Sequence, residues 1–132
     1  MSTLLLEIVT PERTVYSKDV NMVIIRGVEG EMGILPNHVP TVTPLKISAV
    51  TAKIGSNYEN IAVSGGFAEV RHEKVVILAE SAELPGEIDV DRAELAKKRA
   101  EERIRNRNKE TVDHHRAELA LQRALNRLNT RG

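Results

Sequence analysis

The sequence contains no cysteine, very few aromatic residues and no long hydrophobic run, and each absence excludes a class of protein. None of its 132 residues is cysteine, which excludes disulfide frameworks and thiolate metal sites. Its aromatic residues are only Tyr16, Tyr58 and Phe67, too few to form a stacking platform for nucleic-acid bases. No apolar stretch approaches the roughly 20 residues that span a bilayer, and the first residues lack the basic start of a signal peptide. We therefore expect a soluble protein.

Several motifs of catalysis and metal binding are also missing. The sequence has no Gly-Lys-Ser or Gly-Lys-Thr of a P-loop, and the glycines of residues 27–33 do not match a dinucleotide fingerprint. His114 and His115 are adjacent, so on a helix they point about 100° apart, which argues against a shared metal ion. No serine has a recognisable nucleophile motif around it. The sequence therefore predicts a protein with no catalytic residues and no metal of its own.

The charges balance only because the two ends of the chain have opposite signs. Lys and Arg together number 19, and so do Asp and Glu. Residues 1–87 carry 7 basic and 11 acidic side chains, whereas residues 88–132 carry 12 basic and 8 acidic ones. A net charge of −4 is thus joined to a net charge of +4, which indicates two parts with different chemistry.

The first part has the pattern of a β domain. All five prolines and seven of the eight glycines lie within residues 1–87, and apolar residues alternate with polar ones between them, which is typical of half-buried strands. Turn signals fall at residues 27–33, 36–37, 55–57 and 65–66. The alternating positions are Leu4, Leu6 and Ile8; Val50, Ala52 and Ile54; Ile61 and Val63; and Val75, Ile77 and Ala79, with further strands expected near 13–16 and 20–27. Short strands of this kind predict an antiparallel β-sandwich.

The second part has the pattern of two helices. Asp89 follows Pro85-Gly86 and occupies a helix N-cap position, and no proline or glycine interrupts residues 88–131. The polar residues 105–111 predict a bend between the helices. The apolar stripes are Ala93, Ala96, Ala100 and Ile104 in the first helix, and Ala117, Leu121, Ala124, Leu125 and Leu128 in the second. The predicted fold class is α+β, with a β-sandwich over residues 1–84 and a two-helix antiparallel hairpin over residues 85–132.

Arginines lie beside the alanines in both helices. They form one row in each helix, within about 40° of azimuth. The rows are Arg92, Arg99 and Arg103, and Arg116, Arg123 and Arg127. A hairpin packed through its alanines would bring both rows to one edge, where like charges repel one another unless an anion neutralises them. Guanidinium groups match phosphate oxygens, so a polyphosphate is the expected ligand.

Other interpretations of the basic helices remain open at this point. The arginines can form an ordinary solvated face, paired with the nearby acids Glu94, Glu101, Glu102 and Glu118. A β domain with a basic helical tail can also be a nucleic-acid-binding module, whose affinity would fall steeply with salt. A small-molecule enzyme built on the sandwich would need a base or a metal in a cleft, for which the sequence offers no candidate.

Two segments of the first part resemble the epsilon subunit of the bacterial rotary ATP synthase. They are residues 30–40, GEMGILPNHVP, and residues 61–70, IAVSGGFAEV. The resemblance continues through residues 88–93 and 116–128, where the sequence is similar to the ATP-binding members of the family from Bacillus-type thermophiles. Residues 104–115 match the family poorly, and Arg103 and Arg107 add positive charge that the family pattern does not require. The resemblance implies a sandwich of about ten strands followed by a helical hairpin.

The resemblance also implies a function in which the chain is not itself an enzyme. It would be a rotor subunit that binds the gamma subunit and the ring of c subunits and couples c-ring rotation to ATP synthesis and proton transport. It would lie at the cytoplasmic face of the bacterial cell membrane as a peripheral protein. The extended helices would reach the alpha/beta catalytic head and block ATP hydrolysis, whereas bound ATP would favour the folded hairpin. No nucleic-acid partner, membrane insertion or catalytic cofactor is implied, and ATP would be a regulatory ligand.

Specific residues can be carried over from the family's motifs. Glu31 lies in the loop that meets the c ring, and His38 follows in the same segment. The implied ATP-binding residues are Glu83, Ile88, Asp89, Arg92, Ala93, Arg99, Arg116, Arg123 and Arg127.

Overall fold

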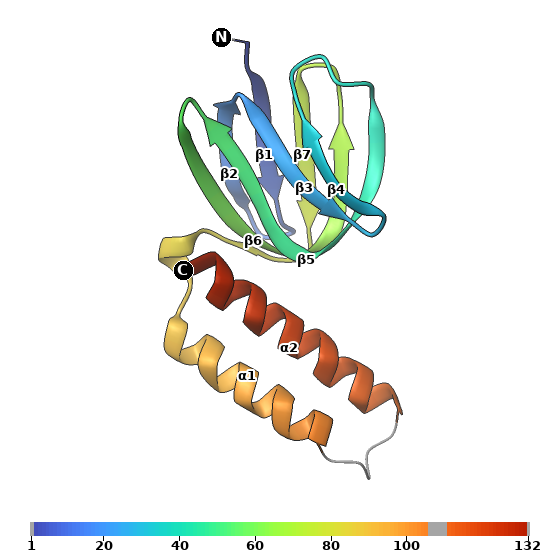
Figure 1. The fold of residues 1–132 in the computed structure, drawn as a ribbon, viewed down its shortest axis with the longest axis vertical. Coiled ribbons are helices and arrows are strands. Elements are labelled where there is room, and N and C mark those ends of the chain that lie inside the picture. The colour runs from blue at the N-terminus through green and yellow to red at the C-terminus, as the bar shows by residue number, and fades with distance from the viewer. Residues whose placement is uncertain (1, 106–110, 132) are drawn as a thin grey trace. The chain divides into compact units, whose positions relative to one another are not determined.

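A computed structural model describes residues 2–105 and 111–131 of the chain. It divides into two compact units, Met1–Leu84 and Pro85–Gly132 (Figure 1). The first unit consists of strands and the second of helices, each described below by itself. None of the described helices is both long enough and apolar enough to cross a bilayer.

Eight strands make up the first unit within the described residues. They are β1 (Leu4–Val9), β2 (Thr14–Val20), β3 (Met22–Gly27), β4 (Gly30–Ile34), β5 (Thr41–Ile54), β6 (Asn57–Val70), β7 (Lys74–Ala79) and β8 (Ala82–Glu83). They form one sheet in the order β2-β1-β7-β6-β5-β3-β4, and β8 pairs with β6. All the pairs are antiparallel except β1 with β7, which run parallel. The sheet curls over on itself, because β2 contacts β5 although the two are not neighbours in the sheet (Figure 1).

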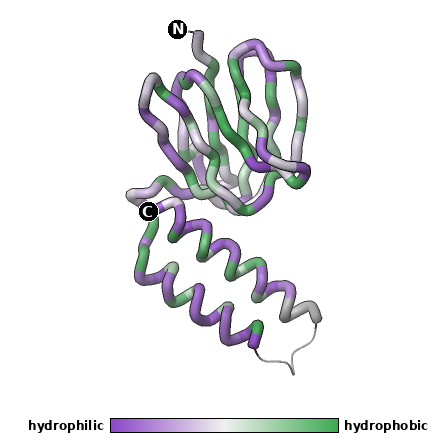
Figure 2. The backbone as a smooth tube through the Cα atoms, viewed as in Figure 1, coloured by the Kyte–Doolittle hydropathy of each residue, from purple (hydrophilic) through white to green (hydrophobic). Residues whose placement is uncertain are grey.

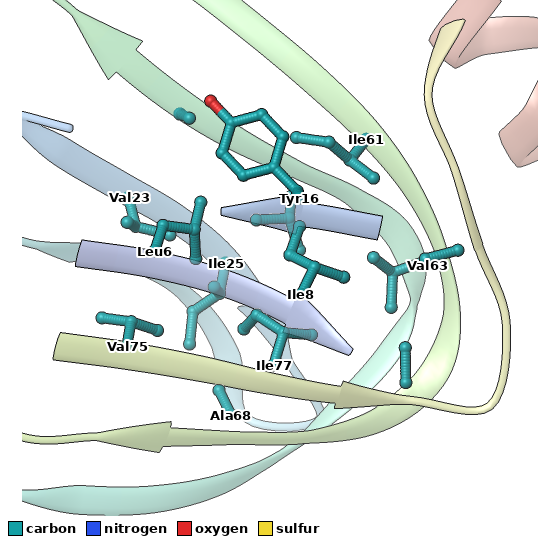
Figure 3. Packing of buried hydrophobic residues seen from close by; sticks show 14 of the residues in the cluster. Leu6, Ile8, Tyr16, Val23, Ile25, Ile61, Val63, Ala68, Val75 and Ile77 are labelled. Atoms are coloured by element: carbon teal, nitrogen blue, oxygen red, sulfur yellow. The ribbon is translucent and has the colours of Figure 1, made fainter. Parts of the chain in front are cut away.

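The core of this unit lies inside the curled sheet and is aliphatic. The predicted alternation is confirmed in β1, where Leu6 and Ile8 are fully buried and the residues between them are partly exposed. In β7, Val75 and Ile77 are likewise fully buried, whereas Leu78 is 49% exposed. Figure 3 shows side chains from β1, β2, β3, β6 and β7 converging on this core.

The described residues contain eight strands, against the approximately ten that the resemblance implies, and two glycine-rich segments predicted as turns differ in detail. Residues 27–33 hold only a two-residue turn at Val28-Glu29, after which β4 begins and pairs with β3. Gly65 and Gly66 lie within β6, a strand of 14 residues, and both have positive φ, at 77° and 124°. The backbone of β7 passes so close to β6 there that a Cβ on Gly66 would collide with the Leu78 carbonyl oxygen. Gly66 therefore permits a close approach of two strands, and neither glycine ends β6.

The second unit contains a short 3₁₀ turn and two helices, η1 (Pro85–Glu87), α1 (Val90–Arg105) and α2 (Thr111–Arg131). Asp89 is the predicted N-cap: its Oδ1 accepts a hydrogen bond of 3.1 Å from the Arg92 N–H, and its carbonyl oxygen accepts one of 3.0 Å from the Ala93 N–H. Most of the bend predicted over residues 105–111 lies outside the described residues. Both helices are mainly hydrophilic, interrupted by apolar positions at regular intervals (Figure 2).

Alanines form the contact between α1 and α2. The two helices pack against each other. Each helix contributes two alanines, seven residues apart, that are almost completely buried. These are Ala93 and Ala100 in α1, and Ala117 and Ala124 in α2. The expected stripe is confirmed at these positions, but Leu125 is 37% exposed, because it lies one residue, or about 100°, past the contact.

Replacing Gly66 by alanine tests the close approach of β6 and β7. We expect Gly66→Ala to lower the free energy of unfolding of the sandwich by about 2 to 5 kcal/mol, because it adds a collision with backbone and an unfavourable positive φ. Gly33→Ala is the matched control, since the new Cβ would meet only the Met22 sulfur at an ordinary 3.8 Å. Urea unfolding of both variants measures the difference, and equal stabilities would contradict the close approach.

Tyr16 makes the stability of the sandwich depend on pH in the alkaline range. Burial, followed by the charge of Glu59 and a hydrogen bond to it, raises the pKa of Tyr16 from 10.0 to about 12. Because the fold favours the neutral phenol, its contribution to stability is complete below pH 10 and is lost as the pH rises from about 10 through about 12. We expect Tyr16→Phe to remove this part of the pH dependence. Urea unfolding at pH 9 and above, compared between wild type and variant, measures it, and identical pH slopes would refute it.

The N-cap of α1 gives a third prediction. Asp89→Ala removes the acceptor for the Arg92 N–H and should destabilise the helical unit by about 1 kcal/mol. Asp89→Asn keeps an acceptor oxygen and should remain close to wild type. Far-UV circular dichroism during thermal unfolding measures the helical loss. If Asp89→Asn lowered the melting temperature of the helical unit as much as Asp89→Ala does, the N-cap hydrogen bond would not be what stabilises the start of α1.

Candidate functional site

A three-residue pattern recurs along the helical hairpin. Arg-Ala-Glu stands at residues 92–94, 99–101 and 116–118, and residues 123–124 repeat the Arg-Ala pair. In every case the alanine is buried in the contact between the helices. The arginine precedes the alanine by about 100° of azimuth and the glutamate follows it by the same angle. In the three Arg-Ala-Glu segments the buried alanine therefore separates a basic side from an acidic side of its own helix, whereas Ala124 is followed by Leu125.

The pairing of the helices places the basic sides together. The helices are joined by residues 106–110 and run antiparallel, as such a short connection requires (Figure 1). In an antiparallel pair, the positions just before the contact residues of both right-handed helices lie on the same edge. We call this the arginine edge, formed by Arg92, Arg99, Arg103, Arg116, Arg123 and Arg127. The opposite glutamate edge is formed by Glu94, Glu101 and Glu118.

Arginines of α1 also lie level with arginines of α2 along the hairpin. Because α1 ends at Arg105 and α2 begins at Thr111, residues equally distant in sequence from these two helix ends lie at about the same level of the antiparallel pair. Arg92 is therefore level with the segment of α2 that contains Arg123 and Arg127. Arg99 and Arg116 are level with each other, about 10 Å further along the helices. The sequence-predicted arginines thus come together as a lower group of three and an upper pair.

Several side chains of this edge are exposed and have no described carboxylate partner. Arg92, Arg99 and Arg116 are exposed, and Arg123 and Arg127 are half-buried. Arg92, Arg99, Arg116 and Arg123 form no ion pair with any carboxylate whose position the structure describes. Of the four acids that could pair with the arginines as a solvated face, Glu94, Glu101 and Glu118 lie on the opposite edge, whereas Glu102 follows Arg99 by three residues and lies on the arginine side of α1. Uncompensated guanidinium groups in a row are suited to phosphate oxygens.

Three of the other predicted ATP-binding residues already have structural roles in the helical unit. Ile88 is 5% exposed and Ala93 is 2% exposed, so both are packing residues. One carboxylate oxygen of Asp89 caps α1. Glu83 lies in β8 and therefore belongs to the other compact unit.

The two predicted c-ring residues lie on the sandwich. Glu31 is in β4 and is exposed, and its Oε2 lies 3.5 Å from the Arg26 Nε. His38 is in the loop between β4 and β5, and its Nδ1 lies 2.7 Å from the Val39 carbonyl oxygen. These contacts are local, so both side chains remain at the surface of the strand and loop that carry them.

The loop that contains His38 has features that the sequence reasoning missed. Asn37 adopts a φ of 68°, and its N–H donates a hydrogen bond of 2.8 Å to the His72 carbonyl oxygen. This bond ties the loop to the turn between β6 and β7. Two large apolar side chains of the loop are exposed, Leu35 at 57% and Val39 at 74%. Exposed apolar side chains on a fixed loop are typical of a contact surface.

No metal site accompanies these features in the described part of the chain. No group of three or more histidine or acidic side chains lies close enough together there to hold a metal ion. His115 is exposed on α2, whereas the His114 side chain lies outside the described residues.

Comparisons with known proteins assign both units to one family. Residues 3–85 match the family model of the ATP synthase delta/epsilon chain beta-sandwich domain. Residues 87–132 match the model of the ATP synthase delta/epsilon chain long alpha-helix domain. The two matches together cover nearly the whole chain.

Curated relatives are similar over their full length. The ATP synthase epsilon chain of Alkalihalophilus pseudofirmus is 57% identical over 132 residues, which is 100% of this chain and 99% of the relative. The epsilon chain of Halalkalibacterium halodurans is 54% identical over the same shares of the two chains.

Solved structures show the same architecture. A chain of the Euglena gracilis mitochondrial ATP synthase, in a structure of OSCP, F1 and the c-ring, superposes with a TM-score of 0.82 at 25% identity, covering 98% of this chain and 81% of that one. A chain of the Tetrahymena thermophila central stalk and c-ring gives a TM-score of 0.61 at 11% identity, covering 98% and 96% of the two chains, and shows the likeness of fold alone. The chain therefore belongs to the ATP synthase delta/epsilon family and is an epsilon-type chain.

Proposed function

We propose that this subunit is a nucleotide-controlled inhibitor as well as a coupling element of the central stalk. The sandwich would bind the gamma subunit and the c ring, and would transmit c-ring rotation to the sites of ATP synthesis. The helical hairpin would bind ATP along its arginine edge. In an extended state the same helices would reach the alpha/beta catalytic head and block ATP hydrolysis. The complex would lie at the cytoplasmic face of the bacterial membrane, with this chain as a peripheral component.

The arginine edge is the observation that carries the nucleotide part of this proposal. It gathers arginines from two helices on one side of a hairpin, and four of them lack an ion pair with any described carboxylate. The like charges repel one another when the hairpin is closed, and a polyphosphate would turn that repulsion into attraction. The lower group of Arg92, Arg123 and Arg127 is the proposed site of the phosphates, and Arg99 and Arg116 would extend it.

The alanine contact explains why such a ligand could act as a switch. Alanine side chains bury little apolar area, so the packing of α1 on α2 stabilises the hairpin only modestly. A ligand at about 100 times its dissociation constant adds about 2.7 kcal/mol to the state that it binds. That amount can decide a balance between two conformations that differ by a few kcal/mol. Low ATP would then release the helices for inhibition.

The exposed loop before β5 supports the proposed contact with the c ring. Leu35 and Val39 supply apolar contact area, and the hydrogen bond from Asn37 to His72 fixes the loop. Glu31 and His38 flank these residues and would supply the polar contacts.

A nucleic-acid-binding role receives less support from the hairpin. The arginine edge is narrow, and the opposite edge carries the glutamates of the three Arg-Ala-Glu segments, which would repel a second strand of phosphates. Tyr58 and Phe67 are the exposed aromatic side chains among the described residues, and both lie on the sandwich.

The experiment that tests the ATP site compares two double variants of the full chain. Arg92→Ala with Arg123→Ala removes one guanidinium from each helix, and we expect ATP to bind at least about 100-fold more weakly, since each charge-assisted hydrogen bond contributes about 1.5 to 3 kcal/mol. Isothermal titration calorimetry with ATP measures the affinity.

Lys46→Ala with Lys98→Ala is the matched control, because it removes two exposed positive charges away from the arginine edge. It should bind ATP almost as wild type does. If the two double variants lost affinity equally, the effect would come from net charge and the assigned site would be wrong.

A further inference from the structure

The ladder between β3 and β5 is interrupted by a bulge in β5. Ile24 pairs with Thr51. The next pair in register is Gly27 with Leu45, so three steps along β3 correspond to six steps along β5. Residues 46–50 therefore have no register partner in β3, although most of them stay paired with β6 on the other side. A carbonyl group of this segment that faces β3 needs a partner from outside the ladder.

Arg26, which lies in β3 opposite the bulge, supplies such a partner. Its Nη1 donates a hydrogen bond of 2.8 Å to the Ala49 carbonyl oxygen, and this contact is partly buried. The Nε of the same guanidinium group lies 3.5 Å from the Oε2 of Glu31. Arg26 and Glu31 are also direct partners in the register of β3 and β4. One planar group thus links the bulge of β5 to a carboxylate of β4.

The ion pair of Arg26 with Glu31 holds the carboxylate without covering it. The Glu31 side chain is 59% exposed and the Arg26 side chain 41% exposed. An ion pair between two mobile surface side chains contributes little, because holding both in one geometry costs side-chain entropy. Here the bond to Ala49 already orders the guanidinium group, so only the glutamate remains to be ordered. Glu31 is therefore an accessible carboxylate beside an anchored cation.

We propose that Arg26 is a positioning residue for the contact of Glu31 with the c ring. This inference rests on the proposed function, in which Glu31 meets the c ring, and adds to it the residue that orders the glutamate before docking. A side chain that is ordered in advance loses less entropy when it binds. Arg26 acts through Glu31 and does not itself need to touch the c ring.

Two effects of Arg26 can be separated by experiment. Arg26→Met keeps the aliphatic part of the side chain but removes the donor to the Ala49 carbonyl oxygen, so it should lower the stability of the sandwich with or without Glu31. Its effect on c-ring binding should depend on Glu31, because the role proposed for Arg26 in binding is exerted through that carboxylate. A double-mutant cycle of Arg26→Met and Glu31→Gln distinguishes the two effects.

The test uses the full chain in complex with the gamma subunit. Surface plasmon resonance measures binding to the purified c ring, and urea unfolding of the free chain measures stability. We expect Arg26→Met to bind the c ring about threefold more weakly, a loss in the range of one exposed ion pair. In the Glu31→Gln background the same change should leave c-ring affinity unaltered but still lower stability. Lys46→Met, which removes an exposed cation of the bulge, is the matched control and should bind as wild type does.

Three results would overturn the role of Arg26 alone. They are an unchanged c-ring affinity of Arg26→Met when Glu31→Gln binds more weakly, an equal loss from Arg26→Met in both backgrounds, or an equal loss from Lys46→Met. The second result would show a structural role, and the third an effect of net charge. Failure of the proposed contact would look different: the wild-type chain would not raise the affinity of gamma for the c ring, or Glu31→Gln would leave that affinity unchanged.

Discussion

The contact of alanine on alanine between α1 and α2 is the constraint on which the rest of the helical unit depends. Ala93, Ala100, Ala117 and Ala124 are at most 2% exposed, and such small side chains allow two helices to approach closely. Close approach narrows the hairpin, so side chains that flank the alanines on the two helices become neighbours. The same contact therefore provides modest stability and concentrates positive charge. With leucine at these positions the hairpin would be firmer, but its arginine rows would lie further apart.

The sandwich is stabilised by much larger apolar side chains than the helical unit. Its core consists of large aliphatic side chains, many fully buried, held by a sheet in which β1 and β7 lie side by side despite their separation in sequence. Burial of that size stabilises a single conformation. The chain thus joins a part with a large aliphatic core to a part with a small alanine contact, and this difference is what the proposed regulation of the helices by a ligand requires.

The sequence predicted those features that arise from local chemistry and periodicity. The strand alternation around Ile8 and Ile77, and the cap at Asp89, depend on neighbouring residues and were confirmed. Gly66 was assigned to a turn because the local pattern does not show that β6 pairs with β7, where the missing side chain leaves room for the Leu78 carbonyl. The separation of the arginine edge from the glutamate edge follows from the antiparallel pairing of α1 and α2, so the sequence predicted the arginine rows but not the glutamates opposite them.

The parallel pairing of β1 with β7 also sets the order in which the protein can form. Strand β1 comes first from the ribosome, yet one of its two neighbours ends at Ala79. Until that residue has emerged, only the hairpin with β2 can shelter the leucines and isoleucine of β1. The sandwich must therefore close late and through distant contacts, whereas α1 and α2 need only each other. A nascent chain would carry an incomplete, apolar β1 for most of its synthesis, and this is the interval in which it would depend most on chaperones.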